Sequence, residues 1–224
     1  MEFLLKFKLN QHLYVKDPES SDLGKTIVEH SIDLIYELGF EQFTFKKLSA
    51  KIHTTEATIY RYFTSKHRLL IYILNWYWCY LEFLSEMLIP AETAPYDKLK
   101  LILNIITHCQ KEQRQLMDYN LGHLHSIVIS ESSKSYLVKE VDTINKEMAF
   151  NPLKSLCKRI SLIILEIRPG YPYARSLAST LLETAHDQQF FSEHLPSLTD
   201  NLSGQQHKEY VLHYLNQLAF SALK

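Results

Sequence analysis

Apolar side chains recur every three or four positions through most of this chain, which is the spacing of an α-helix with one buried face. One such stripe runs from Ile27 to Leu38, and another runs from Leu153 to Ile167. Glycine and proline, which interrupt helices, account for only 5 and 7 of the 224 residues. The predicted fold class is therefore all-α.

The overall charge and the cysteine spacing give no sign of a strongly basic protein, a disulfide-rich protein or a zinc protein. The 24 lysines and arginines are matched by 25 aspartates and glutamates, so nucleic-acid binding would need a local concentration of positive charge. The three cysteines, Cys79, Cys109 and Cys157, are far apart and form no CxxC pair. They indicate neither a disulfide framework nor a zinc site, and they fit a reducing cytoplasm.

The apolar segments are too short or too interrupted for a leader peptide or a membrane span. Lys6 and Lys8 break the apolar run at the start of the chain, so we expect no signal peptide. The span from Leu69 to Leu84 contains Asn75 and Glu82 and falls short of the roughly 20 residues that cross a bilayer. We expect a buried helix there and a cytoplasmic protein.

The spacing of apolar side chains changes near residue 20 of the chain. Residues 1–20 alternate between apolar and polar side chains, which predicts an extended arm or a short strand. A helical period begins at Asp22, and Gly39 is a suitable carboxyl-terminal cap for that helix. Ser65 can cap a later, long helix from Lys66 to about Met87.

Two short helices are expected between these longer ones. Thr44 can cap the first, and Thr55 can cap the second, which we expect over residues 55–63. Three or four residues join them, which is the arrangement of a helix-turn-helix unit. In such a unit the second helix lies in the major groove of DNA.

This unit holds a local positive charge that the balance of the whole chain conceals. Between Glu41 and Leu70 the sequence has six basic residues against two acidic ones. The basic residues are Lys46, Lys47, Lys51, Arg61, Lys66 and Arg68. Such a cluster is typical of a surface that binds nucleic acid.

Side chains on the second short helix suit base edges. Thr58, Arg61 and Tyr62 lie about one turn apart and can face the bases together. Ile59 and Phe63 then take the inner face. A threonine suits several bases through its hydroxyl and methyl groups, and an arginine suits guanine.

Phosphate contacts need hydrogen-bond donors, and three residues near these helices are suitable. They are Thr44, the hydroxyl of Tyr60, and Lys66 at the start of a helix. Glu56 is harder to explain, because phosphates repel a carboxylate. Either it accepts a hydrogen bond from a cytosine amino group or it lies off the interface, and the sequence leaves both readings open.

The stretch GFEQFTFKKLSAKIHTTEATIYRYFTSKHRLL resembles the DNA-binding domain of the TetR/AcrR family of bacterial transcriptional regulators. The resemblance covers about residues 22–85, and beyond them only the all-helical plan agrees. The matching residues are Gly39, Phe40, Thr44, Leu48, Ala50, Thr55, Thr58, Ile59, Tyr60, Tyr62, Phe63, Ser65, Lys66, Leu69 and Leu70. His53 departs from the glycine that the family usually has in this turn, and it can take a left-handed backbone only at some cost.

The resemblance implies a set of DNA contacts and a division into domains. The positions that match family contacts are Thr44, Lys46, Thr55, Glu56, Thr58, Tyr60, Tyr62 and Lys66. Arg61 is added to them because its chemistry suits guanine. We expect an amino-terminal arm at 1–21, a DNA-binding domain at 22–68, and a helical effector-binding and dimerisation domain at 69–224.

A single domain of this kind makes few base contacts, so we expect a homodimer on a palindromic operator of double-stranded DNA. The apolar stripes of the last two helices are too wide to be covered by one partner helix each. The family commonly joins its subunits through a four-helix bundle of these helices, which is expected at 171–193 and 205–223.

Aromatic residues crowd the long fourth helix, where they can either line a ligand cavity or fill a core. The candidate ligand contacts are Trp76, Tyr80, Phe83, Tyr119 and His123. A small molecule that prefers one tilt of this helix would change the operator affinity. We expect no cofactor. His123 and His125 are two positions apart, which points them to different sides of a helix and predicts no metal site.

Motifs of catalysis are missing from the sequence, which has no GxSxG, P-loop or HExxH, so we expect no enzyme. A repressor is the tendency of the family. The alternative is a helical small-molecule-binding or interaction protein whose helix-turn-helix has lost its DNA function, for which His53 and Glu56 argue. Steep salt dependence of DNA binding would distinguish the two.

Overall fold

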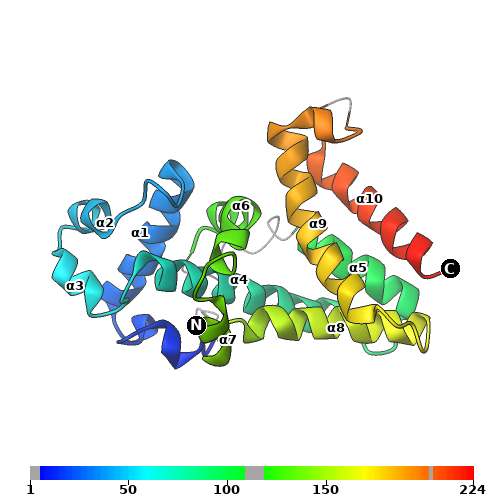
Figure 1. The fold of residues 1–224 in the computed structure, drawn as a ribbon, viewed down its shortest axis with the longest axis horizontal. Helices are drawn as coiled ribbons and strands as arrows, with labels where there is room; N and C mark the ends of the chain where they lie inside the picture. Colours follow the sequence, from blue (N-terminus) through cyan, green and yellow to red (C-terminus); the bar gives the residue numbers. More distant parts are fainter. Residues whose placement is uncertain (1–5, 109–118, 202–203) are drawn as a thin grey trace. The chain divides into compact units, whose positions relative to one another are not determined.

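The structure, a computed structural model, describes residues 6–108, 119–201 and 204–224 (Figure 1). Every regular element in these ranges is a helix, which confirms the all-α prediction. The chain forms two compact units. Unit 1 comprises residues 1–77 and 110–151, and unit 2 comprises residues 78–109 and 152–224.

Unit 1 begins with the three helices of the helix-turn-helix region. They are α1 (Asp22–Leu38), α2 (Phe45–Lys51) and α3 (Glu56–Tyr60). The capping predictions are confirmed, because the Thr44 side chain accepts the amide of Lys47 and the Thr55 side chain accepts the amide of Thr58. Gly39 ends α1 with a φ of 75°, a conformation that glycine adopts without steric cost.

The third helix is shorter than predicted. It ends at Tyr60, whereas the sequence predicted a helix to residue 63. After Tyr60 the amides of Arg61 and Tyr62 bond to the carbonyls of Thr58 and Ile59, at 3.3 and 2.8 Å. These bonds reach back three residues instead of four, so the chain tightens into a turn that shifts the direction of the following side chains.

The amino-terminal segment is folded onto unit 1. Residues 6–21 form no strand but two 3-10 turns, η1 (Gln11–Leu13) and η2 (Pro18–Ser20). The side chains of Asn10 and Asp17 cap these turns by accepting backbone amides. Capping competes with an extended backbone, which is why the alternating pattern did not produce a strand.

The rest of unit 1 is also helical. It contains the first half of α4 (Lys66–Leu88), α6 (Leu121–Glu131), the 3-10 turn η3 (Ser132–Ser135) and α7 (Val141–Lys146). Helix α6 packs against α1. Inside the unit the hydroxyl of Tyr77 lies 2.6 Å from Nδ1 of His125, and both residues are buried.

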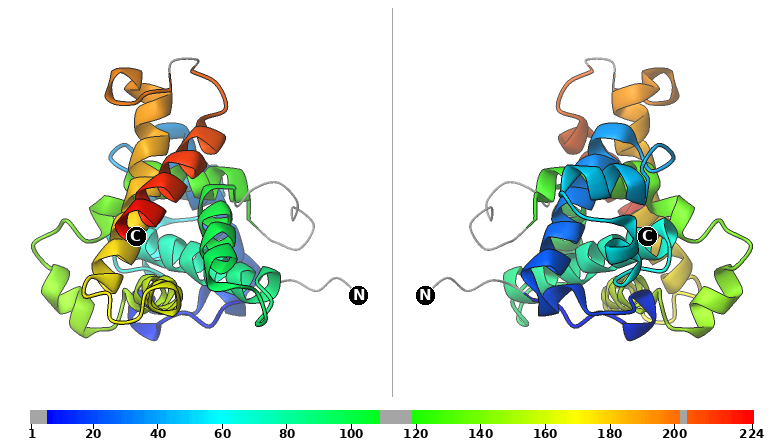
Figure 2. Two further views of the ribbon diagram at one scale, coloured as in Figure 1. Left: turned by 90° about the vertical axis from the view of Figure 1, so that its right-hand side faces the viewer. Right: turned by 90° about the vertical axis from the view of Figure 1, so that its left-hand side faces the viewer.

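Unit 2 is built from longer helices. It holds the second half of α4, α5 (Pro95–His108), α8 (Asn151–Ile167), α9 (Ala174–His194), the 3-10 turn η4 (Pro196–Leu198) and α10 (His207–Ala222). Figure 1 and the left view of Figure 2 show α10 beside α9, and α10 also contacts α5. No helix within the described residues is long and apolar enough to cross a membrane.

A histidine lies in the core of unit 2. His186 on α9 is 3% exposed, and neither ring nitrogen has a hydrogen-bond partner among the described residues. Burial lowers the pKa of His186 from its ordinary value to about 4, because the charged imidazolium would lose its hydration. The folded protein therefore holds this imidazole neutral at pH values where the unfolded chain protonates it.

This difference predicts a loss of stability in acid. The loss begins as the pH falls below about 6.5, where only the unfolded chain gains the proton, and amounts to about 2 kcal/mol near pH 4.5. We expect His186→Leu to reduce this pH dependence, measured by urea unfolding at pH 7 and pH 4.5. His194→Leu, at an exposed position of the same helix, is the control and should behave like the natural protein. An unchanged pH dependence in His186→Leu would contradict the assignment.

Candidate DNA-binding site

A row of polar side chains lies on the exposed side of α3. The hydroxyls of Thr55 and Thr58 are 2.9 Å apart, and a guanidinium nitrogen of Arg61 donates to the Thr58 hydroxyl at 3.2 Å. These bonds join residues three positions apart and hold the three side chains together. The row therefore presents two hydroxyls and a guanidinium on one surface, which is the chemistry that base edges accept.

Tyr60 lies next to this row and is half exposed. Its ring meets the buried Phe45 of α2 edge-to-face, with centroids 5.0 Å apart. This contact joins α2 to α3 and fixes the orientation of the Tyr60 ring. The exposed half of the tyrosine remains at the surface of the unit.

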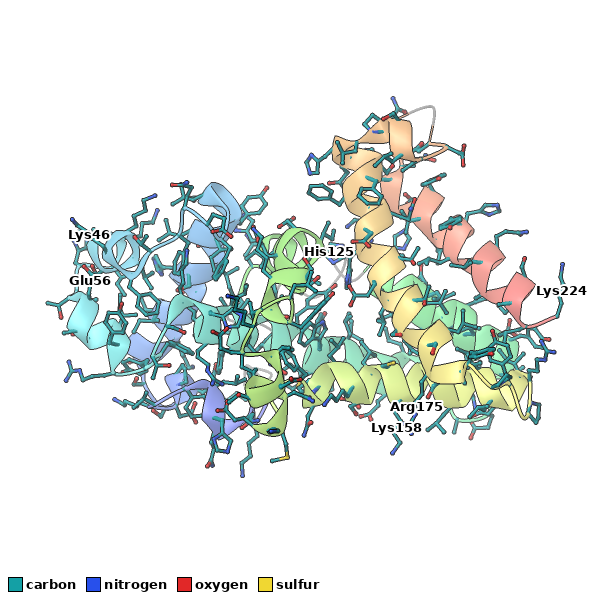
Figure 3. The ribbon with its side chains drawn as sticks, viewed as in Figure 1. Lys46, Glu56, His125, Lys158, Arg175 and Lys224 are labelled. Atoms are coloured by element: carbon teal, nitrogen blue, oxygen red, sulfur yellow. The ribbon has the colours of Figure 1, made fainter. Side chains whose placement is uncertain are left out.

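Three more candidate residues surround α3. Thr44, the cap of α2, and Lys46 on α2 are exposed, and Glu56 is exposed in the first turn of α3. Figure 3 shows Lys46 and Glu56 on the side of unit 1 where α2 and α3 adjoin. Glu56 lies in the first turn of α3, where the positive end of the helix favours a negative charge, so this residue has a structural reason to be acidic.

Tyr62 does not join the exposed row. Only 3% of its surface is exposed, and its hydroxyl bonds to Ser21 Oγ at 2.8 Å and to Lys16 Nζ at 3.2 Å. The hydrogen bond from Ser21, together with Lys16, lowers the pKa of Tyr62. The base contact that helical spacing predicted for Tyr62 does not fit this placement, because the turn after Tyr60 directs position 62 inward.

Lys66 is also engaged within the protein. Its Nζ donates to the carbonyls of Phe40, Glu41 and Phe43, at 3.0, 3.1 and 3.2 Å. It also lies 4.7 Å from the centre of the Phe40 ring. An ammonium group has three hydrogens, so these bonds use its full donor capacity. Lys66 therefore holds the turn between α1 and α2. The sequence had suggested Lys66 as a donor to phosphate, but its ammonium group has no free hydrogen for that contact here.

The same turn is held from the side of α6. The amide of Phe40 donates to Oε1 of Glu131 at 3.1 Å, and Oε2 of Glu131 pairs with Lys134 Nζ at 2.7 Å. Glu131 is buried, and it lies 91 positions from Phe40 in the chain. No sequence pattern marks this residue, because nothing local links it to the helix-turn-helix region.

The five candidate ligand contacts are divided between the two units and do not form one cluster within either unit. Tyr80 and Phe83 belong to unit 2, and the other three belong to unit 1. Trp76 and Tyr119 meet edge-to-face with centroids 5.2 Å apart, and the Tyr119 hydroxyl donates to Glu19 Oε1 at 2.6 Å. The structure thus brings Trp76 and Tyr119 together.

His123 lies against α1. Its Nδ1 is 2.7 Å from Asp33 Oδ1, and its ring stacks on Tyr36 with centroids 4.0 Å apart. No group of three or more histidine, cysteine or acidic side chains within the described ranges is placed to hold a metal ion.

The comparisons with known proteins agree with this geometry. Residues 27–73 match the family model described as bacterial regulatory proteins, tetR family. This region of the chain is therefore similar to the DNA-binding part of that family. The matched segment contains α2, α3 and the start of α4, so it covers the exposed row and the turn that Lys66 holds. No curated protein matches the chain.

Two solved structures share the fold. One is a crystal structure of AibR in complex with isovaleryl coenzyme A and operator DNA, with a TM-score of 0.56 and 14% identity over 87% of this chain and 96% of that one. The other is described as the molecular basis for control of antibiotic production by a bacterial hormone, with a TM-score of 0.51 and 16% identity over 90% and 98% of the two chains. At such identities the likeness is one of fold.

The role of Lys66 leads to a stability prediction. Lys66→Met leaves three carbonyls without their charged donor, so we expect the free energy of unfolding to fall by about 1–3 kcal/mol. Lys51→Met, at an exposed position at the end of α2, should change it little. Chemical denaturation measures both. Amide hydrogen exchange in residues 39–43 should accelerate in Lys66→Met only. Equal effects of the two substitutions would contradict the role of Lys66 in holding this turn.

Proposed function

We propose that this protein is a cytoplasmic, non-enzymatic, ligand-responsive repressor that binds a palindromic operator as a homodimer. The observation that carries the proposal is the exposed row of Thr55, Thr58 and Arg61 on α3, inside the segment that matches the TetR family. The AibR structure, which contains both operator DNA and a small molecule, supports the combination of DNA binding and ligand response.

The residues divide into DNA contacts and positioning residues. Thr58 and Arg61 face base edges, with the arginine on guanine. Thr44, Lys46 and Tyr60 contact phosphates, which fix the register of the protein on the duplex. The list of base-reading residues is completed by Thr55 and, where a cytosine amino group is within reach, Glu56.

Tyr62 and Lys66 then act through the protein. The Tyr62 carbonyl accepts the amide of Val15 at 2.8 Å, so this residue ties the amino-terminal segment to the end of α3. Lys66 fixes the turn that leads into α2. Both residues position the surface that DNA meets, without touching the DNA themselves.

A second copy is needed to place two α3 helices on one operator. Helix α10 buries Val211, Leu215 and Ala219 within unit 2, while Tyr214 on another side of the helix remains 38% exposed. On α9, Phe190 and Phe191 are also only half-buried. These aromatic surfaces support a subunit interface through α9 and α10, as the sequence suggested for 171–193 and 205–223.

The alternative, a helical binding protein without DNA function, rested on His53 and Glu56. His53 has a φ of 52°, so it adopts the left-handed turn that glycine usually forms at this place in the family. Glu56 lies in the first turn of α3. Neither residue disturbs the geometry of α2 and α3, which favours the DNA-binding function.

Two neighbouring tyrosines give a matched test of the DNA contacts. Tyr60→Phe removes an exposed hydroxyl, so we expect operator binding to weaken about fivefold with little change in stability. Tyr62→Phe removes the buried hydroxyl that bonds to Ser21 and Lys16, so we expect a lower free energy of unfolding as its main effect. The operator is first isolated by selecting bound genomic fragments with the purified protein, and binding is measured by fluorescence anisotropy.

The same assay tests the function as a whole. Operator affinity should fall steeply as salt rises, and the protein should prefer the operator to random duplex. Arg61→Ala should lower that preference by about tenfold or more. Binding that ignores both sequence and salt, or an Arg61→Ala protein with full preference, would favour the alternative function.

The proposed interface predicts an effect on oligomeric state. Tyr214→Glu places a carboxylate within the contact between subunits, so we expect the dimer to dissociate at least about tenfold more readily. Light scattering after size-exclusion chromatography measures the mass over a dilution series. Leu137→Glu, at a 75% exposed position of unit 1, is the control. A Tyr214→Glu protein that stays dimeric at every dilution would place the interface elsewhere.

A further inference from the structure

A groove of about 420 Å³ lies between α8 and α9 within unit 2. Helix α8 lines it with Leu153, Lys154, Cys157 and Lys158, and α9 lines it with Arg175, Ser179, Leu182 and Glu183. The α8 residues form two adjacent pairs that lie four positions apart, and the α9 residues Arg175, Ser179 and Leu182 follow at four and three positions, so each helix offers one continuous face. The volume lies within the range of sites that bind small molecules.

The groove is apolar at its base and positively charged at its rim. Leu182 is buried, Leu153 and Cys157 are half-buried, and Lys158 and Arg175 are exposed. The lining contains three cations, the third being Lys154, against the single carboxylate of Glu183. A ligand that matches both parts has an apolar body and a negative head.

Two of these cations come from different helices and line the same groove. Figure 3 labels them, Lys158 on α8 and Arg175 on α9. Neither side chain forms an ion pair or a side-chain hydrogen bond with any of the residues that the structure describes. Like charges that line one groove repel each other, and a bound anion would remove that repulsion.

We propose that this groove binds an amphipathic anion, with an oxyanion head on Lys158 and Arg175 and an apolar tail over Leu153, Cys157 and Leu182. The planar guanidinium of Arg175 can donate two parallel hydrogen bonds to a carboxylate or a phosphate. The ammonium of Lys158 adds a second charge. The proposal does not depend on DNA binding.

Titration of the full-length protein with octanoate and with octyl phosphate tests the two parts of the site. Octan-1-ol, which lacks the charge, and acetate, which lacks the tail, should each bind at least about tenfold more weakly than the better of the two anions. The preference between octanoate and octyl phosphate identifies the head. Equal binding of octan-1-ol and both anions, or no binding of either anion, would overturn the proposal.

Exposed substitutions test the head contacts. Arg175→Gln should weaken binding of the preferred anion about tenfold, and the double variant with Lys158→Gln should weaken it further. Lys224→Gln, an exposed charge at the end of the chain, is the control and should leave binding unchanged. Full affinity in the double variant would overturn the proposal.

Cys157 reports where the ligand binds. A Cys79→Ser, Cys109→Ser protein keeps only this thiol, whose S–H lies 3.6 Å from the carbonyl of Arg175. Burial raises the pKa of the Cys157 thiol, so labelling with N-ethylmaleimide is followed at alkaline pH. We expect a saturating anion to slow the labelling at least about threefold, because the tail covers the thiol.

Two results of the labelling would overturn the proposal. One is labelling that does not change when the anion binds. The other is labelling that accelerates on dilution of the unliganded protein, which would assign the groove to a second copy of the chain. Operator affinity is measured separately, so loss of DNA binding with intact anion binding would refute the proposed function and leave this site in place.

Discussion

The turn between α1 and α2 is held by one charged side chain on each side, and the proposed DNA-binding surface depends on this turn. Lys66 donates hydrogen bonds to three carbonyls of this turn, and Glu131 accepts the amide of Phe40. These backbone groups have no partner within a helix, and leaving them unpaired would destabilise the turn, so the two side chains stabilise it by satisfying them. Because α2 begins directly after the turn, the contacts of Lys66 and Glu131 also fix where α2 starts, and α3 follows α2 in the chain.

A second set of contacts holds the far end of α3. Tyr62 joins Ser21, Lys16 and Val15, so the segment before α1 is attached to the residues that follow α3. Helix α3 has only five residues and would not be stable alone. Its shape therefore depends on Phe45 beneath Tyr60, on the Thr55 cap and on the buried Tyr62.

Local chemistry made much of this fold predictable from the sequence. The helical period, the caps Thr44 and Thr55 and the glycine at the end of α1 each act within one turn, and each was confirmed. The sequence predicted the inward placement of Ile59 and Phe63 for the same reason. The expectations for Tyr62 and Lys66 differed from the structure because spacing along a helix does not show where that helix ends, or which distant carbonyls surround an ammonium group. Glu131 and the groove between α8 and α9 depend on contacts between segments far apart in the chain, and no sequence pattern marks them.

The compact unit that carries α2 and α3 is assembled from two separate parts of the chain. Glu147, beyond α7, binds Arg68 of α4, and its carbonyl accepts a hydrogen bond from Asn10. Glu131 and His123 on α6 reach Phe40 and Asp33 in the same way. An evolutionary exchange of only the first 70 or so residues between relatives would separate these partners. Residues 119–151 therefore belong to the same compact unit as α2 and α3, which cannot be exchanged as an independent amino-terminal module without losing these contacts.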